Sequence, residues 1–331
     1  MKFAFLFFGD QANENWQLCE QMGIKYAIAK LSTEHTGNKK PWELETMQLS
    51  LEKFKNAGFE LIGFEGDQFD MNRIKFGLPG REEDIAHYIQ MLENMGKLGI
   101  KLLCYNFMAG LGWYRTHTRL LERGDAFVSG FNLDDPINNE LTPFGTLSAD
   151  KLWENYVWFL NQVLPVAERV GVKMALHPDD PPVSPLRGIA RIFTNANQIR
   201  RALSLSESPS HGLTFCQGTY STMGEDVKSL IHEFGSNGKI FFVHIRDVIG
   251  SSSNFRETFH DNGPTDMVDL FRAYKDARID VPLRSDHVPT MAGESNEQHG
   301  YAMKGNLFGI GYLAGIMEAL DIPSDLNKER T

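Results

Sequence analysis

The chain has 331 residues, of which 42% are hydrophobic and 23% charged, a balance that allows a sizeable core and excludes wholesale disorder. The 33 Lys and Arg residues against 43 Asp and Glu residues give a formal net charge of −10. This charge argues against a nucleic-acid partner, since such binding depends on neutralising phosphates. No stretch approaches the ~18 apolar residues that would span a bilayer, so we expect no membrane partner.

The three cysteines, Cys19, Cys104 and Cys216, are odd in number and do not form a disulfide framework. We therefore expect a reducing, cytoplasmic location. The apolar run at residues 3–8 ends at Gly9-Asp10, with no small-residue cleavage site after it. This run predicts a strand rather than a signal peptide.

Eight short apolar segments alternate with longer amphipathic stretches along the chain. Mostly apolar segments of this length are typical of strands that are buried on both faces of a parallel sheet. The segments are residues 3–8, 26–29, 60–64, 101–105, 173–176, 212–215, 240–243 and 281–283. Apolar residues at steps of three and four predict helices over residues 42–56, 85–98, 152–170, 227–234 and 267–277.

Eight strand–helix units predict an α/β fold, a (β/α)8 TIM barrel that forms a single domain over residues 1–331. The competing fold is an open doubly wound sheet, but Gly9-Asp10-Gln11 lacks the glycine-rich fingerprint that would follow its first strand. The stretch between the fourth and fifth strands is too long for one helix and two loops. We place an insertion or lid there, at residues 109–150. Its aromatic residues, Phe127 and Phe131 among them, indicate either a subunit contact in a homo-oligomer or a loop packed on its own barrel.

Residues able to bind a metal follow four consecutive predicted strands, at the barrel end where catalytic side chains lie. They are His177, Cys216, His244 and Asp286. Each alone has an ordinary explanation as a loop histidine, a packed thiol or a turn residue. Together they form a mixed N/S/O donor set that suits a divalent transition ion. The sequence therefore predicts a metal site at this rim. We expect five other histidines to lie on loops or helices in contact with solvent: His35, His87, His117, His211 and His232.

The same region resembles the mannonate dehydratase family of metal-dependent barrel enzymes. The resemblance is strong over residues 100–320, and its most specific motifs are HPDDPP and RxDH. It is carried by CYNFM (104–108), MALHPDDPP (174–182), GLTFCQGTY (212–220), FFVHIRD (241–247), PLRSDH (282–287) and GYAMKGNLFGIGYLAGIMEAL (300–320). The resemblance implies a lyase that removes water from a small-molecule sugar acid. Its substrate would be D-mannonate, its product 2-keto-3-deoxy-D-gluconate and its cofactor one Mn²⁺ or Fe²⁺.

The resemblance also implies a role for individual residues. The metal ligands would be the four residues at the strand ends. His287 and Tyr301 would transfer protons, with the acid and base roles left open, although Tyr301 alone is as typical of a phenol that anchors a loop. Arg246, Arg284 and Asn106 would contact the substrate.

The loops that would shape the substrate pocket depart from the family pattern. Residues 27–32 stand where the family has His-His-x-Pro, and Glu65-Gly66-Asp67-Gln68 stands where it has Ser-Val-Pro. The loop at residues 259–264 is shortened. The segments with the predicted metal ligands thus match the family, whereas the loops expected to contact the substrate do not.

Three other functions compete with a hydro-lyase. A metal-dependent sugar isomerase or epimerase on the same barrel would carry more Glu residues at its strand ends. A metal-dependent phosphodiesterase or endonuclease would require a basic groove, which the charge of −10 disfavours. A non-enzymatic sugar-acid binder would not need a complete ligand set. We favour the hydro-lyase.

Overall fold

The computed structural model describes residues 1–327, and its centre is a closed barrel of parallel strands. The strand order around the barrel is β1-β12-β9-β8-β7-β4-β3-β2. The TIM-barrel prediction is confirmed, and each of the eight predicted segments matches a strand to within two residues at either end. The strands are β1 (Lys2–Phe8), β2 (Tyr26–Lys30), β3 (Glu60–Glu65), β4 (Leu102–Tyr105), β7 (Lys173–Leu176), β8 (His211–Cys216), β9 (Ile240–Ile245) and β12 (Pro282–Ser285).

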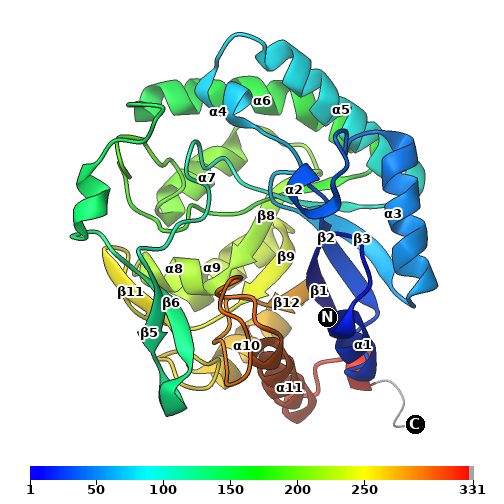
Figure 1. The fold of residues 1–331 in the computed structure, drawn as a ribbon, viewed down its shortest axis with the longest axis vertical. Helices are drawn as coiled ribbons and strands as arrows, with labels where there is room; N and C mark the ends of the chain where they lie inside the picture. The colour runs from blue at the N-terminus through cyan, green and yellow to red at the C-terminus, as the bar shows by residue number, and fades with distance from the viewer. Residues whose placement is uncertain (328–331) are drawn as a thin grey trace.

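Helices surround the barrel, as Figure 1 shows. The five predicted helices are confirmed as α3 (Leu44–Asn56), α5 (Arg81–Leu98), α6 (Ala149–Val170), α9 (Val227–Ser236) and α10 (Met267–Asp276). The others are α1 (Glu14–Gln21), α2 (Thr33–Thr36), α4 (Asn72–Phe76), α7 (Ala196–Ser204), α8 (Gln217–Thr222) and α11 (Met303–Ala319). Short 3₁₀ turns lie at Arg123–Asp125, Pro136–Asn139 and Asp325–Asn327.

The bounds of α6 follow from its sequence. The Ser148 side chain accepts a hydrogen bond from the backbone N–H of Lys151 and caps the first turn. Gly171, with φ 70°, ends the helix in the left-handed conformation that glycine adopts without steric cost. Between them, side chains such as Tyr156 and Phe159 are fully buried against the barrel.

Aromatic side chains fill the layer between the first strand and its helices. Trp16 of α1 stacks on Phe54 of α3, with ring centroids 4.4 Å apart, and Phe7 of β1 lies 5.4 Å from Phe54. All three are at most 5% exposed. Burying a side chain of this size stabilises the fold by roughly 1.5–3 kcal/mol, so this cluster fixes α1 and α3 on the barrel wall.

The 109–150 segment contains strands that pair outside the barrel. Its β5 (His117–Leu121) and β6 (Phe127–Asn132) join β10 (Val248–Ser251) and β11 (Asn254–Glu257), which follow β9, in an antiparallel sheet of order β10-β11-β6-β5. This sheet lies beside the barrel in Figure 1. Phe131 is 1% exposed, and its ring lies 6.0 Å from that of Phe255. Of the two alternatives for this segment, the burial of Phe131 supports a loop packed on its own chain rather than a subunit contact through this residue.

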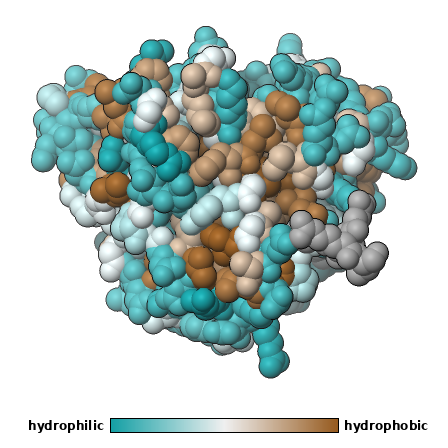
Figure 2. All heavy atoms as spheres, turned by 90° about the horizontal axis from the view of Figure 1, so that it is seen from below, coloured by the Kyte–Doolittle hydropathy of each residue, from teal (hydrophilic) through white to brown (hydrophobic). Residues whose placement is uncertain are grey.

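The surface is mixed in character. Figure 2 shows apolar groups in several separate areas among hydrophilic ones on the face it presents. Among residues 1–327, no helix is both long enough and apolar enough to cross a bilayer.

Candidate metal centre

The register of the barrel strands places three polar side chains at one level of the wall. Cys216 of β8 is paired with His244 of β9, and His244 is paired with Arg284 of β12. His177 follows β7 directly, and Asp286 follows β12. The sequence placed Cys216 and His244 just beyond their strands. Both lie within them instead, because the backbone pairing extends β8 by one residue and β9 by two.

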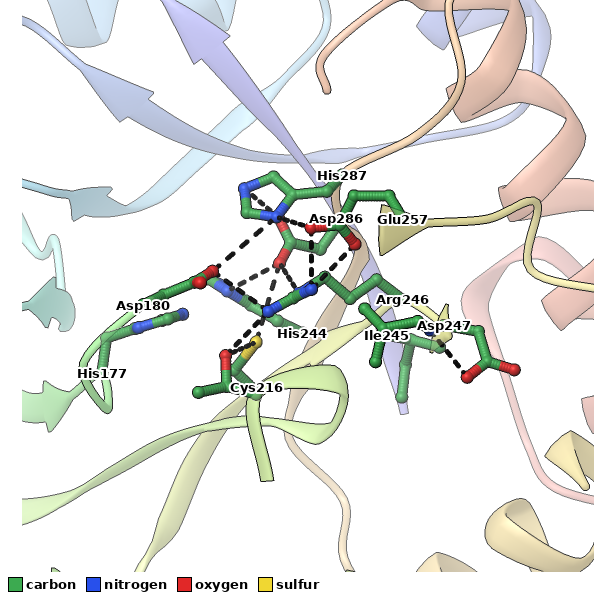
Figure 3. Close-up of polar contacts among 12 residues, drawn as sticks. His177, Asp180, Cys216, His244, Ile245, Arg246, Asp247, Glu257, Asp286 and His287 are labelled. Carbon is green, nitrogen blue, oxygen red and sulfur yellow. Dashed lines mark hydrogen bonds and ion pairs between the residues drawn. The ribbon is translucent and has the colours of Figure 1, made fainter. Parts of the chain in front are cut away.

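The four predicted metal ligands converge at this rim (Figure 3). The donor atoms of His177, Cys216 and His244 all lie within 4.8 Å of one another. Asp286 Oδ2 lies 3.7 Å from Cys216 Sγ and 3.8 Å from His244 Nδ1. Two donors bonded to one ion at about 2.0–2.3 Å stand ~3–4.5 Å apart, so these spacings fit a single divalent ion.

Hydrogen bonds orient the two imidazoles. His177 Nδ1 lies 2.7 Å from the carbonyl oxygen of Pro178 and donates to it, which leaves Nε2 with its lone pair. His244 Nε2 lies 3.3 Å from the Glu65 carboxylate, to which it donates when Nδ1 binds a metal. A carboxylate or carbonyl behind a histidine is the usual support for a metal ligand.

Asp286 is held in its ionised form. Burial by itself would raise its pKa, but the charge of Arg284, followed by those of His287, His244 and Arg246, holds the pKa well below the usual range. The Arg284 guanidinium lies 2.8 Å from Asp286 Oδ1. The site thus offers two ring nitrogens, a thiol and a carboxylate that is ionised at neutral pH. This donor set fits a divalent transition ion.

A second trio, Glu65, Cys104 and His244, also brings its donor atoms within 4.8 Å of one another. Both Glu65 oxygens are occupied, however, because Arg284 donates to them at 3.0 Å and 2.6 Å. Burial would raise the Glu65 pKa, but Arg284 and His244 lower it to about 2. A carboxylate bound in this way by a guanidinium is not free to bind a metal. The trio that contains Cys216 is therefore the better candidate.

Two arginines and two acids form a closed ring of buried ion pairs behind Asp286. Arg115 donates to Asp180 at 2.7 and 2.9 Å and to Glu257 at 2.7 Å. Arg246 donates to Glu257 at 2.8 and 2.9 Å and to Asp180 at 3.0 Å. Figure 3 shows Asp180, Arg246 and Glu257 beside the predicted ligands His244 and Asp286. The ring joins the 109–150 segment, the loop after β7, the end of β9 and β11.

The two predicted proton-transfer residues are in contact. His287 Nε2 lies 3.2 Å from the Tyr301 hydroxyl, and His287 Nδ1 lies 3.5 Å from Glu257 Oε1. His287 has φ 29°, a conformation that is rare for a residue with a side chain and is found mainly at functional sites. Trp113 packs 4.7 Å from the His287 ring. Burial and the nearby Asp286 charge raise the pKa of Tyr301, so its phenol is protonated at neutral pH.

A pocket of about 370 Å³ opens at this rim, a size that suits a small molecule. Of the nine predicted site residues, six line its wall: Asn106, His177, Arg284, Asp286, His287 and Tyr301. Cys216 and His244 are buried at the barrel wall. Arg246 is fully buried too, and its guanidinium donates to Glu257, Asp180 and Thr219. It therefore lies behind the four predicted ligands rather than on the pocket wall.

A family model for D-mannonate dehydratase (UxuA) matches residues 1–132 and 128–326. The chain belongs to this family. The predicted resemblance is thereby confirmed, and the match runs over nearly the whole chain rather than mainly over residues 100–320.

Relatives of the D-mannonate dehydratase family align over three quarters or more of the chain. The chain is 31% identical to the mannonate dehydratase of Thermotoga maritima, over 97% of this chain and 98% of that protein. It is 34% identical to mannonate dehydratase 2 of Halalkalibacterium halodurans, over 75% and 79% of the two chains. The solved mannonate dehydratase of Streptococcus suis serotype 2 is 27% identical with a TM-score of 0.87, covering 100% of this chain and 99% of that one. A xylose isomerase domain protein from Planctomyces limnophilus, at 10% identity and a TM-score of 0.63, shows the shared barrel fold alone.

The site in this dehydratase-family chain contains residues that the sequence did not single out. Asp180 lies in the HPDDPP motif, but nothing in the motif said which of its acids faces the site. Arg115 and Glu257 come from segments outside the regular barrel, and their side chains are 142 positions apart in the sequence. Glu65 directly follows the predicted strand at residues 60–64 and ends β3, a position that could have marked it as a partner of the candidate metal site.

Proposed function

We propose that this protein is a mannonate dehydratase, a metal-dependent hydro-lyase that converts D-mannonate to 2-keto-3-deoxy-D-gluconate and water. The observation that supports this most strongly is the four-residue donor set placed directly beside the His287–Tyr301 pair. The mannonate dehydratases that align along the whole chain support the same reaction. The pocket then binds the small-molecule sugar acid as its substrate.

The proposed metal ligands are His177, Cys216, His244 and Asp286, and the expected ion is Mn²⁺ or Fe²⁺. When bound, the ion supplies positive charge that makes the C2 proton of the acid easier to remove. The chain's own contribution is to hold these donors at fixed positions through strand register and the contacts of Glu65 and Pro178.

The dehydration needs a base for the proton on C2 and an acid for the hydroxyl group that leaves C3. We assign His287 as the base, because its Nε2 lies 3.2 Å from the Tyr301 hydroxyl and Glu257 Oε1 lies 3.5 Å from its Nδ1. Tyr301 is the acid, since its phenol keeps its proton at neutral pH. The C2 proton passes to His287, a C2–C3 double bond forms, and the C3–O bond breaks. The oxygen leaves as water with the proton of Tyr301, and the resulting enol becomes the 2-keto acid.

The remaining predicted residues divide between the pocket wall and the layer behind it. Arg284 lines the pocket and offers positive charge to the substrate carboxylate, while Asn106 offers its amide. Arg246 is a positioning residue. Its Nε lies 3.6 Å from Asp286 Oδ2, and it also holds Glu257, so it acts through these two carboxylates.

Two further proposals concern the protein as a whole. The three cysteines are free and buried, which supports a reducing, cytoplasmic location. Leu121 and Leu141 are each 59% exposed, which supports a homo-oligomer that covers them. Sedimentation of the purified protein tests the second proposal, and a monomer at all concentrations would contradict it.

The deciding experiment is a turnover assay on metal-stripped protein, with and without added Mn²⁺, over a panel of hexonates and uronates. We expect 2-keto-3-deoxy product from D-mannonate only when the ion is present. Product from a different aldonate alone would keep the lyase mechanism and change the substrate. A bound metal without any keto-deoxy product would overturn the dehydratase and favour an isomerase or epimerase.

A further inference from the structure

A second group of polar side chains follows β3 and β4, in the half of the barrel away from Cys216 and His244, and has no part in the proton transfers proposed above. Asp67 follows β3 and Asn106 follows β4, and both line the pocket. In the strand order, β3 stands opposite β9. Lys75 of α4 lies behind the two residues and is 1% exposed.

The buried Lys75 fixes the other two side chains. Its ammonium donates to Asp67 Oδ2 at 2.6 Å, to Asn106 Oδ1 at 3.0 Å and to the carbonyl of Met108 at 3.4 Å. All three of its protons are used. Asn106 Oδ1 also accepts from the backbone N–H of Met108 at 3.0 Å. Since both neighbours of this oxygen are donors, the orientation of the Asn106 amide is decided.

What remains free on this wall is one acceptor and one donor. Within residues 1–327, neither Asp67 Oδ1 nor Asn106 Nδ2 has a hydrogen-bond partner, and neither atom is buried away from the pocket. A hydroxyl group both donates and accepts, so it matches such a pair. Both side chains are immobilised beforehand, which lowers the entropy cost of binding.

The charges on this wall are balanced. Lys75 is paired with Asp67 at 2.6 Å, and Lys30, which also lines the pocket, is paired with Glu34 at 2.8 Å. Each cation therefore has its own acid, and no surplus positive charge is available for an anionic group. Arg284 is paired as well, with Glu65 and Asp286, so a bound divalent ion at the candidate metal site would supply the positive charge for the substrate carboxylate.

We propose that Asp67 and Asn106 form the subsite for the hydroxyl-bearing end of the substrate. This inference rests on the proposed function and deepens it. The pocket takes acids with one carboxylate and a neutral polyol tail, and it discriminates against acids that carry a second anionic group at the far end. Asp67 is the specificity-determining residue, because its free carboxylate oxygen accepts a hydroxyl proton and offers no proton to a second anionic group.

The test measures binding without turnover. The 3-deoxy analogue of D-mannonate lacks the leaving hydroxyl group, and 2,4-dihydroxybutanoate is its shorter form without carbons 5 and 6. The corresponding 3-deoxy hexarate carries a second carboxylate. Calorimetry with Mn²⁺-loaded protein compares the three acids on the wild type, on Asp67→Asn and on the control Asp70→Asn. Asp70 lies on the same loop, is exposed and does not line this pocket.

For Asp67→Asn, we expect binding of the hexonate analogue to weaken roughly 10-fold or more, as for loss of a hydrogen bond to a charged group. Binding of the short acid stays unchanged, and the hexarate gains affinity relative to the hexonate. Asp70→Asn matches the wild type with all three. Equal losses on the hexonate and the short acid, or no loss on either, would overturn the inference.

The wild type alone gives a second test that needs no variant. A hexarate bound as tightly as the hexonate analogue would overturn the inference even if Asp67→Asn failed to fold. Dehydration of D-mannonate together with unchanged discrimination in Asp67→Asn would remove the inference and keep the proposed function. A wild type that binds none of the acids would remove both.

Discussion

In the half of the barrel formed by β7, β8, β9 and β12, the polar side chains are buried and held by the register of the strands. Cys216, His244 and Arg284 stand side by side on paired strands, and a ring of buried ion pairs supports them from behind. In the other half, Asp67 and Lys30 are partly exposed and are held by single ion pairs. A metal centre needs donor positions that are fixed to a fraction of an ångström. Substrate recognition can instead change with the loops after the strands without disturbing the barrel.

The sharpest test of this division replaces each of two buried cysteines with serine, in separate variants. Cys216→Ser should lose the metal and reduce kcat by roughly 10³-fold or more, since it removes a ligand of the ion. Cys104→Ser, on β4 and outside the proposed ligand set, should keep one equivalent of metal. Metal content after loading and dialysis, measured beside the turnover rate, checks both. Loss of the metal in Cys104→Ser and not in Cys216→Ser would place the ion at the trio with Glu65.

Removing the proton-transfer residues should affect the rate and spare the metal. His287→Asn and Tyr301→Phe should each lower kcat by about 10²–10⁴-fold, the usual contribution of a general acid or base. We expect metal content to stay at the wild-type level in both. Exchange of the C2 proton with solvent deuterium separates the roles. It should persist in Tyr301→Phe and vanish in His287→Asn, and the opposite pattern would exchange the two assignments.

The buried ion ring should behave as one unit. Glu257→Gln leaves Arg115 and Arg246 without one of their acids and should cost about 3 kcal/mol of unfolding free energy, because an uncompensated buried charge remains. Urea unfolding measures this loss. Asp261→Asn is the matched control, since Asp261 pairs with Arg123 at the surface and should change the stability by less than about 1 kcal/mol. Equal effects of the two variants would show that the ring adds nothing beyond a surface pair.

A smaller effect, on the pH dependence of stability, is expected from His211, which lies far from both halves of the site. The sequence placed His211 in solvent, but it is the first residue of β8 and is fully buried, because the barrel interior covers one face of such a strand and helices cover the other. Burial lowers its pKa to about 4, below the ordinary value of 6.5. The unfolded chain therefore binds more protons between these values, so stability rises with pH across this window and is lost as the pH falls through it.

For His211, we expect a loss of about 2 kcal/mol between pH 7 and pH 5 in the wild type that His211→Leu does not share. Urea unfolding at the two pH values measures it. His232→Leu, which changes an exposed histidine, serves as the control and should keep the wild-type slope. If His211→Leu loses as much stability as the wild type, other groups carry the pH dependence.

The strands and the convergence of the four candidate metal ligands could be predicted from the sequence because both depend on local patterns. A strand buried on both faces must be apolar along its length, and the residue at its end falls at the catalytic rim of any barrel. Those two facts were enough to bring His177, Cys216, His244 and Asp286 together before any contact was known. The family motifs added the His287–Tyr301 pair, whose side chains are in contact in the structure.

The tertiary structure alone decided which charged side chains stand on the pocket wall and which lie behind it. Arg246 and Arg284 both follow the pattern of a substrate-binding arginine, yet only Arg284 lines the pocket. The sheet that joins β6 to β11 had no signal of its own, because each strand is short and its partner lies more than a hundred positions away. Pairings of that kind depend on loop closure and on buried charges that meet only after folding. The spacing of apolar residues along the chain does not indicate such pairings.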